Sequence, residues 1–141
     1  MALKIAATTI VSEAIHLNLA GYRAGSPEKK AFLSLWTGTV GGVSYNDSLP
    51  LNFQIVENSS GIPRFSGTAS FRKSSTSTDE DYFATNLQKA DVWEMNFGGF
   101  QTPGAYRLVV TGVGCSLPFA ISGGWWQDKA ILSAKELYYQ R

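Results

Sequence analysis

Residues 92–122 read VWEMNFGGFQTPGAYRLVVTGVGCSLPFAIS, and this stretch decides the fold. Apolar and polar side chains alternate along three short runs, at 92–97, 105–111 and 116–122, and turn-forming residues separate the runs. A period of two residues is typical of a β-strand that buries one face. The stretch therefore predicts three strands joined by turns.

The turn TPGAY, at 102–106, is the most specific feature of this stretch. Pro103 and Gly104 supply a tight turn, and Tyr106 follows at the start of the next strand. In immunoglobulin-like domains a tyrosine placed this way bonds through its hydroxyl to nearby backbone, an arrangement called the tyrosine corner. We therefore give Pro103, Gly104 and Tyr106 structural roles. The Cys-Trp-Cys signature of antibody domains is absent, so the turn indicates architecture and no function.

Four similar runs precede the stretch, at 14–20, 30–36, 51–57 and 64–71. Together the runs predict an all-β fold, an immunoglobulin-like antiparallel sandwich of about seven strands over residues 15–122. The alternation also predicts which side chains face inward: Leu17, Leu19, Ala31, Leu33, Leu35, Phe53, Ile55, Trp93, Met95, Phe97, Tyr106, Leu108, Val110, Leu117, Phe119 and Ile121.

The composition limits the classes of partner. The chain has 141 residues, of which 12 are basic and 11 acidic, so its charge supplies no electrostatic case for nucleic acid or for an anionic membrane surface. No run approaches the roughly 20 apolar residues of a membrane-spanning helix. We therefore expect a soluble or secreted protein that binds neither nucleic acid nor membrane. The single cysteine, Cys115, allows no intrachain disulfide.

The two ends of the chain differ from the alternating region. Residues 1–14 are predicted to be a flexible leader, because their apolar run is too short and too rich in threonine for the core of a signal peptide. At the other end, glycines 123 and 124 mark a break. The period then changes to 3.6 residues, so residues 123–141 are predicted to be a linker followed by a helix, with Asp128 placed to cap it.

The predicted helix has an unusually wide apolar arc. On a 3.6-residue period Lys129, Ser133, Glu136 and Gln140 form one polar stripe, and apolar or aromatic side chains fill most of the remaining circumference. A helix that lies on one core needs an apolar face of roughly 100°, so a wider face indicates a second body on the other flank. The predicted contact residues for a partner are Tyr22, Trp125, Trp126, Ile131, Leu132, Leu137, Tyr138 and Tyr139.

No constellation of catalytic or metal-binding residues is evident. His16 and Cys115 could form a dyad, but a histidine on the polar face of a strand and a cysteine near a turn are the favoured interpretations. Asp79 to Asp81 could bind calcium, but they lack EF-hand spacing, so we favour a solvated loop and leave metal binding open. No pair of acids is marked for glycoside hydrolysis. The sequence thus predicts no catalytic residue and no cofactor.

Aromatic residues offer an alternative function. Tyr22, Trp36, Trp93, Trp125 and Trp126 could form a flat platform for a sugar ring, as in a stand-alone carbohydrate-binding module. The favoured interpretation is that Trp93 is buried in the core and that Trp125 and Trp126 are packed in a hinge between two bodies. Binding to insoluble cellulose that disappears in Trp125→Ala or Trp126→Ala would support the module instead.

Four segments, taken in order, resemble one family. IHLNLAGYRAGSPEKKAFLSL resembles an opening that reads Asn-Gln-Val-Gly-Tyr before a Pro and a Lys-Ala strand, and FQIVENSSGIPRFSGTAS resembles the strand, turn and strand that follow. The segment 92–121 is similar to Asp-Phe-Ser, then Pro-Gly-x-Tyr-x-Leu, then Ser-x-Pro-Phe, and AILSAKELYYQR resembles a helix ending in Phe-Tyr-Tyr-Gln-Arg. The chain thus resembles the N-terminal immunoglobulin-like domain that precedes the catalytic domain in many family 9 glycoside hydrolases, the endoglucanases and related cellulases.

The resemblance has departures. Leu19 and Ala20 replace the Gln and Val of the first motif, and Asn96 and Gly98 replace the Asp and Ser of the third. The segment 72–91 has no obvious counterpart. These changes affect the opening loop and the region of Asn96, and they leave the fold expectation intact.

The resemblance implies an accessory role. In the family, catalysis rests on an Asp-Ala-Gly-Asp motif and a distant Glu, both in an (α/α)6 barrel that follows the Tyr-Tyr-Gln-Arg segment. The Asp-Ala-Gly-Asp motif does not occur in this sequence, and no residue here corresponds to that Glu. It implies that the domain packs against that barrel and stabilises it, that residues 131–141 belong to the first barrel helix, and that the parent enzyme is secreted and degrades polysaccharide. By itself the chain is expected to cover its apolar helix, for example by self-association. An independent hydrolase is the least favoured interpretation.

Overall fold

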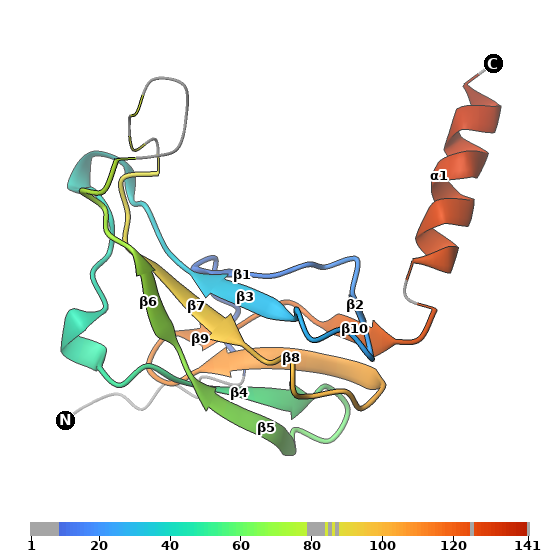
Figure 1. Ribbon diagram of the computed structural model, residues 1–141, viewed down its shortest axis with the longest axis horizontal. Coiled ribbons are helices and arrows are strands. Elements are labelled where there is room, and N and C mark those ends of the chain that lie inside the picture. The colour runs from blue at the N-terminus through green and yellow to red at the C-terminus, as the bar shows by residue number, and fades with distance from the viewer. Residues whose placement is uncertain (1–8, 79–83, 85, 87, 125, 141) are drawn as a thin grey trace.

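Short strands in two layers and one projecting helix make up the computed structural model, which describes residues 9–78, 84, 86, 88–124 and 126–140 (Figure 1). The elements are β1 (Ile15–His16), β2 (Tyr22–Arg23), β3 (Lys30–Leu33), the short 3-10 helices η1 (Gly38–Val40) and η2 (Asn46–Ser48), β4 (Asn52–Glu57), β5 (Pro63–Thr68), β6 (Ser70–Lys73), β7 (Val92–Asn96), β8 (Gly104–Val110), β9 (Gly114–Cys115), β10 (Phe119–Ser122) and α1 (Gln127–Tyr139).

The strands form two sheets that face each other. One has the order β1-β3-β7-β6, and the other has the order β2-β10-β8-β4-β5 with β9 paired to β8. Neighbouring strands are antiparallel, except that β2 and β10 run parallel. The predicted all-β, immunoglobulin-like sandwich is therefore confirmed.

One predicted strand is divided between the two sheets, and another ends before the chain crosses from one sheet to the other. The run 64–71 is split at Ala69, so that β5 pairs with β4 in one sheet and β6 pairs with β7 in the other. Ala69 is buried at this crossing and donates its N–H to Leu51 O at 2.8 Å. The run 14–20 contains only β1, and the chain then crosses to β2 in the second sheet. A period of two residues continues through such a crossing, so the pattern did not reveal it.

Most of the predicted inward side chains lie in the core. Ala31, Leu33, Phe53, Ile55, Met95, Phe97, Leu108 and Val110 are among the most completely buried. The inward predictions for Leu19 and Leu117 were wrong, because each residue lies in a connection between strands and is about half exposed. The tyrosine corner is confirmed: the Tyr106 hydroxyl donates to Pro103 O at 3.3 Å, and its ring is buried.

The predicted flexible leader ends earlier than residue 14. Val11 bridges to Cys115 in β9, where Ile10 O accepts the N–H of Cys115 at 2.8 Å and Ser12 donates to Cys115 O at 2.9 Å. Ala14 is buried in the core. The open edge of β9 needs backbone partners, and residues 10–12 supply them.

Candidate docking surface

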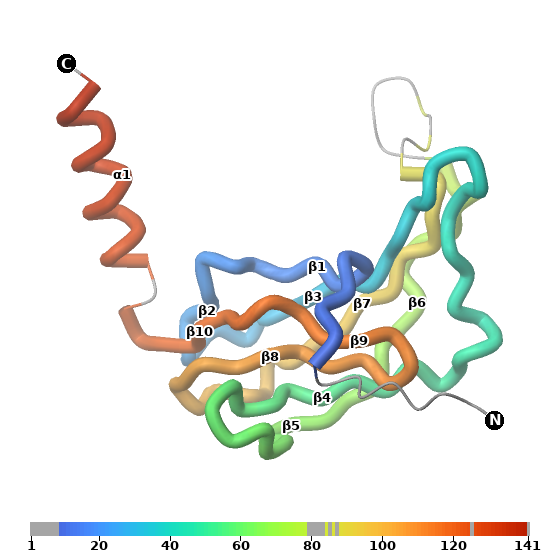
Figure 2. Tube along the Cα trace, turned by 180° about the vertical axis from the view of Figure 1, so that it is seen from behind, coloured from blue at the N-terminus to red at the C-terminus, as the bar shows by residue number. Residues whose placement is uncertain are grey.

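Helix α1 leaves the sandwich after β10 and projects away from both sheets (Figures 1 and 2). None of its described residues is buried. Its large apolar and aromatic side chains are each more than half exposed, from 55% for Ile131 to 79% for Tyr139, and they are Ile131, Leu132, Leu137, Tyr138 and Tyr139. These five residues form what we call the α1 surface.

The start of α1 lacks a side-chain cap. Trp126 occupies the N-cap position and makes no capping hydrogen bond. The expected cap, Asp128, lies instead in the first turn, where its negative charge interacts favourably with the positive end of the helix dipole. Because isolated helices shorter than about 12–15 residues are marginal in water, a helix of 13 residues needs tertiary contacts to be stable.

A depression of about 610 Å³ lies at the base of α1 and is lined by Arg23, Gly25, Ser26, Pro27, Gly123 and Trp126. The parallel pairing of β2 with β10 brings its two sides together, and the N–H of Ala24 donates to Ser122 O at 3.0 Å. Trp126 is 55% exposed at its rim. The predicted contact residue Trp126 therefore lies at the N-terminal end of α1, while Trp125 lies outside the described residues.

Tyr22 does not belong to this surface. It is buried, with its ring edge-on to Phe97 at 5.1 Å and to Phe119 at 5.6 Å between ring centres. Its hydroxyl donates to Lys30 O at 2.7 Å and accepts the N–H of Asn18 at 2.9 Å. Burial raises the pKa of this hydroxyl above its ordinary value. The prediction of a partner contact was wrong here because Tyr22 packs in the domain's own core.

The described aromatic residues do not gather into a sugar platform. Trp93 is buried in the core, as Tyr22 is. Trp36 and Trp126 are exposed, but Trp36 lines a depression with Glu13 and Gln88 near β1, and Trp126 lines the one at the base of α1. The two exposed rings thus belong to separate parts of the surface.

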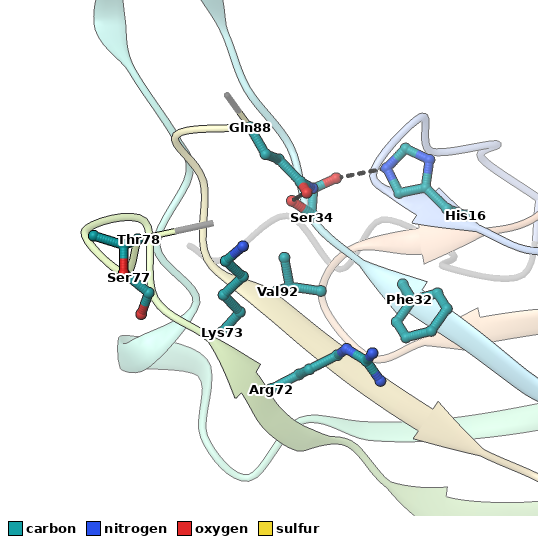
Figure 3. Close-up of a pocket in the computed structure, with 9 residues that line it drawn as sticks. All are labelled: His16, Phe32, Ser34, Arg72, Lys73, Ser77, Thr78, Gln88 and Val92. Atoms are coloured by element: carbon teal, nitrogen blue, oxygen red, sulfur yellow. Dashed lines mark hydrogen bonds between the residues drawn. The ribbon is translucent and has the colours of Figure 1, made fainter. Parts of the chain in front are cut away.

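A second depression, of about 860 Å³, lies on the outer face of the β1-β3-β7-β6 sheet (Figure 3). Its lining residues are His16, Phe32, Ser34, Arg72, Lys73, Ser77, Thr78, Gln88 and Val92. His16 Nε2 donates to Ser34 O at 2.9 Å, and Gln88 Nε2 donates to Ser34 Oγ at 2.9 Å. The Arg72 guanidinium covers the Phe32 ring at 5.3 Å. The lining offers polar contacts, and among its described residues there is no pair of carboxylates for acid-base chemistry.

The sequence singled out only His16 from this depression. Phe32, Arg72, Lys73 and Val92 lie in strands, on positions that the alternation treats as ordinary surface, and the remaining lining residues lie in the connections. A dyad of His16 with Cys115 is not formed, because His16 lies in the first sheet while Cys115 is buried in the second against Val56 and Val109. Within the described residues no cluster could hold a metal ion. Asp79 to Asp81 lie outside the described residues.

An ion-pair network borders the depression. Lys30 Nζ lies 3.1 Å from one oxygen of Glu94, and Arg72 Nη1 lies 2.6 Å from the other. The hydrogen bond from Lys30, with a further one from Arg72, holds the pKa of Glu94 below its ordinary value. The carboxylate therefore stabilises the fold above its ordinary pKa, and this contribution is lost as the pH falls through the folded value.

Glu94→Gln is expected to lower the free energy of unfolding at neutral pH by about 0.5–1 kcal/mol, the range of surface ion pairs. The difference from the wild type should shrink as the pH falls, because the wild-type carboxylate then becomes protonated. Urea unfolding at neutral and acidic pH measures this. Glu136→Gln, on the polar stripe of α1, is the control, and an equal pH dependence of the two variants would contradict the assignment.

Comparison with known protein families shows to which family this chain belongs. A family model described as the cellulase N-terminal ig-like domain matches residues 11–115, which is 105 of the 141 residues. The chain belongs to this family. The match begins at Val11, where the structure also has the first pairing with β9. The predicted resemblance to the immunoglobulin-like domain of family 9 glycoside hydrolases is thereby confirmed.

Solved structures of family 9 proteins contain similar domains. A Bacteroides ovatus family 9 glycoside hydrolase is 26% identical with a TM-score of 0.63, over 93% of this chain and 19% of that one. A metagenome-derived family 9 endoglucanase is 24% identical with a TM-score of 0.58, over 77% and 18%. A thermostable endoglucanase from Alicyclobacillus acidocaldarius, 16% identical with a TM-score of 0.52 over 82% and 16%, shares the fold. No curated protein is similar enough to be a match.

These comparisons place the immunoglobulin-like domain as a small part of larger proteins. The chain spans less than a fifth of the length of each of the three structures. A match that ended before Gln127 would leave out at least 15 of the 141 residues, which is more than a tenth, so one that covers 93% of the chain must reach α1. Among the described residues no helix is long and apolar enough to cross a membrane.

Proposed function

We propose that this immunoglobulin-like domain is the non-catalytic accessory domain of a family 9 glycoside hydrolase that degrades a β-1,4-glucan outside the cell. In this proposal the α1 surface and Trp126 dock on the catalytic (α/α)6 barrel of that enzyme and stabilise it. Membership of the cellulase N-terminal family and the small share of the related proteins that the chain spans both support this role.

The observation that supports docking most strongly is the exposure of the α1 surface. Its five large side chains lie around most of the helix, and each contributes about 1.5–3 kcal/mol when it passes from water into a packed interface. The sandwich covers none of them. A partner that surrounds the helix can bury both flanks at once, as the first helix of a barrel is buried by its neighbours.

Two carboxylates on the strands, Glu57 and Glu94, also support a role without catalysis. A general acid for glycoside cleavage needs a raised pKa. Hydrogen bonds from Ser60 and Arg64 instead lower the pKa of Glu57, and those from Lys30 and Arg72 lower that of Glu94. Both carboxylates are therefore ionised and paired with cations on strand surfaces. We propose that the chemistry belongs to the barrel and not to this domain.

The proposal is tested in a fusion protein in which this chain replaces the matched region of the Bacteroides ovatus protein. Leu137→Asp is expected to destabilise the fusion protein by about 3 kcal/mol or more, because a charge then replaces an apolar side chain in the interface. Ser133→Asp introduces the same charge on the polar stripe and should change little. Thermal unfolding measures both variants.

The same two variants in the separate domain provide the control. Because α1 projects from the sandwich and none of its described residues is buried, Leu137→Asp and Ser133→Asp should each leave the unfolding of the sandwich unchanged within about 0.5 kcal/mol. Equal effects of the two variants in the fusion protein would contradict docking through the α1 surface.

A further inference from the structure

Lys29 is a completely buried lysine in the loop between β2 and β3. Its exposed fraction is 0%, although lysine is among the residues that are almost never fully buried without a partner. No described carboxylate forms an ion pair with it. Its Nζ donates instead to three backbone carbonyls, Ala24 O at 3.0 Å, Gly98 O at 3.2 Å, and Ser26 O.

The three carbonyls form a cage for positive charge. A carbonyl oxygen only accepts hydrogen bonds, so three of them around one nitrogen require that the nitrogen donates all three of its protons. Burial lowers the pKa of Lys29 below its ordinary value, and the carbonyl dipoles oppose that effect by favouring the ammonium form. Rings of backbone carbonyls are also how proteins bind small cations by replacing their hydration shell.

The cage joins two separate parts of the chain. Ala24 and Ser26 belong to the loop that follows β2, and Gly98 belongs to the turn after β7. The turn can approach because residue 98 has no side chain: a Cβ there would lie 1.8 Å from Pro27 O. The N–H of Phe97 also donates to Lys29 O at 2.9 Å. Lys29 thus holds the loop by its side chain, and the turn by both its side chain and its backbone carbonyl.

The same loop forms one wall of the depression at the base of α1. Gly25, Ser26 and Pro27 face Gly123 and Trp126 across it. Release of the Ser26 carbonyl would therefore move one wall of the depression at the base of the helix.

We propose that the carbonyls of Ala24, Ser26 and Gly98 form a binding site for a small organic cation, which the domain fills with its own Lys29 ammonium, and that this internal cation positions the loop 24–28 beneath α1. The site is independent of the proposed function, because it lies within this domain and needs no partner.

The test is chemical rescue of Lys29→Ala in the 141-residue chain. Removal of the ammonium leaves three carbonyls without donors, so the unfolding temperature should fall by about 10 °C or more. The n-propylammonium ion has the three carbons and the nitrogen that the substitution removes. It should raise the unfolding temperature of Lys29→Ala by several degrees more than that of the wild type.

1-Propanol at the same concentration is the matched control, because it has a similar size and no charge. If it restores Lys29→Ala as well as propylammonium does, or if propylammonium acts equally on the wild type, the cation site is wrong. If Lys29→Ala does not fold in buffer alone, the same comparison is made on the yield of refolded protein.

Lys29→Met tests the positioning of the loop. Methionine fills the space of the apolar stem and supplies no charge, so this variant should be destabilised and should not respond to propylammonium. Its backbone amide resonances should shift at 23–28, 97–100 and 123–126, while those of the distant turn at 58–61 stay in place. Unchanged resonances at 123–126 would overturn the link to the base of α1, and wild-type stability would overturn the cage.

Discussion

Replacing Phe97 with alanine is expected to lower the free energy of unfolding by about 3–5 kcal/mol, because the substitution opens a cavity in a close-packed core. Phe97 has an exposed fraction of 0%. Its ring lies 5.1 Å from Tyr22 and 5.8 Å from Phe119 between ring centres, so it joins the first part of the chain to β10. Loss of the edge-on contact with Tyr22 and of the tilted contact with Phe119 adds to the loss of burial.

Phe71→Ala is the matched control for this prediction. Phe71 loses the same atoms, but it lies on the edge strand β6 and is already half exposed, with Trp93 at 5.0 Å. Phe71→Ala should therefore lower the free energy of unfolding by only about 1 kcal/mol, since about half of the Phe71 surface is in water in the folded state as well as in the unfolded state. Urea unfolding of the two variants at one pH measures the difference. A loss for Phe97→Ala no greater than that for Phe71→Ala would contradict the position of Phe97 in the core.

The period of two residues was sufficient to predict most of the strands, because a strand in a sandwich turns one of its faces toward the core. Met95, Phe97, Leu108 and Val110 follow it and are buried. The same rule failed where the chain crosses between sheets. At Ala69 the alternation continues without interruption while the hydrogen-bond partners change from β4 to β7. Pairing across the sheet is a long-range property, and a local pattern does not contain it.

The docking surface was only partly predictable. The helical period identified the α1 surface, because an apolar arc is local in sequence. Tyr22 was misplaced, because an aromatic residue next to a turn glycine reads equally well as a core residue or a surface residue. Trp126 lies where the change of period predicted a linker.

Lys29 was not predicted as a site, although a signal was present. It has the same parity as Ala31 and Leu33, which face inward, so the alternation itself placed a lysine on the core side. Its partners are carbonyls of the backbone, and no side-chain motif marks them. The outer depression around His16 was also not predicted, because its lining residues are distant in sequence and only the pairing of the strands brings them together.

Amide hydrogen exchange in α1 is expected to slow by a factor of about 100 or more when the domain is joined to its catalytic partner. In the separate domain none of the described helix residues is buried, and 13 residues give the helix little stability of their own. Docking should add at least about 3 kcal/mol to the free energy of local opening, which corresponds to more than a hundredfold in protection. The strands β4 and β8, at the centre of the second sheet, provide the internal reference, because their protection should be the same in both proteins.

The control for self-association is a series of protein concentrations. A second copy could also cover the α1 surface, so the separate domain is measured at several concentrations, together with its sedimentation. Protection of α1 that rises with concentration indicates pairing of two copies, which is the expected behaviour of an apolar surface without its partner. The dilute limit then reports the helix alone.

The central claim is that the α1 surface is made to be covered by a catalytic barrel, and hydrogen exchange of Ile131 to Tyr139 tests it most directly. The measurement compares the dilute separate domain with the fusion protein to the Bacteroides ovatus partner, and the intact Bacteroides ovatus protein shows the protection of its own corresponding helix. We predict nearly unprotected amides in the separate domain and strong protection in the fusion protein. Strong protection in the dilute monomer, or no protection in a fusion protein whose barrel is folded, would contradict the account.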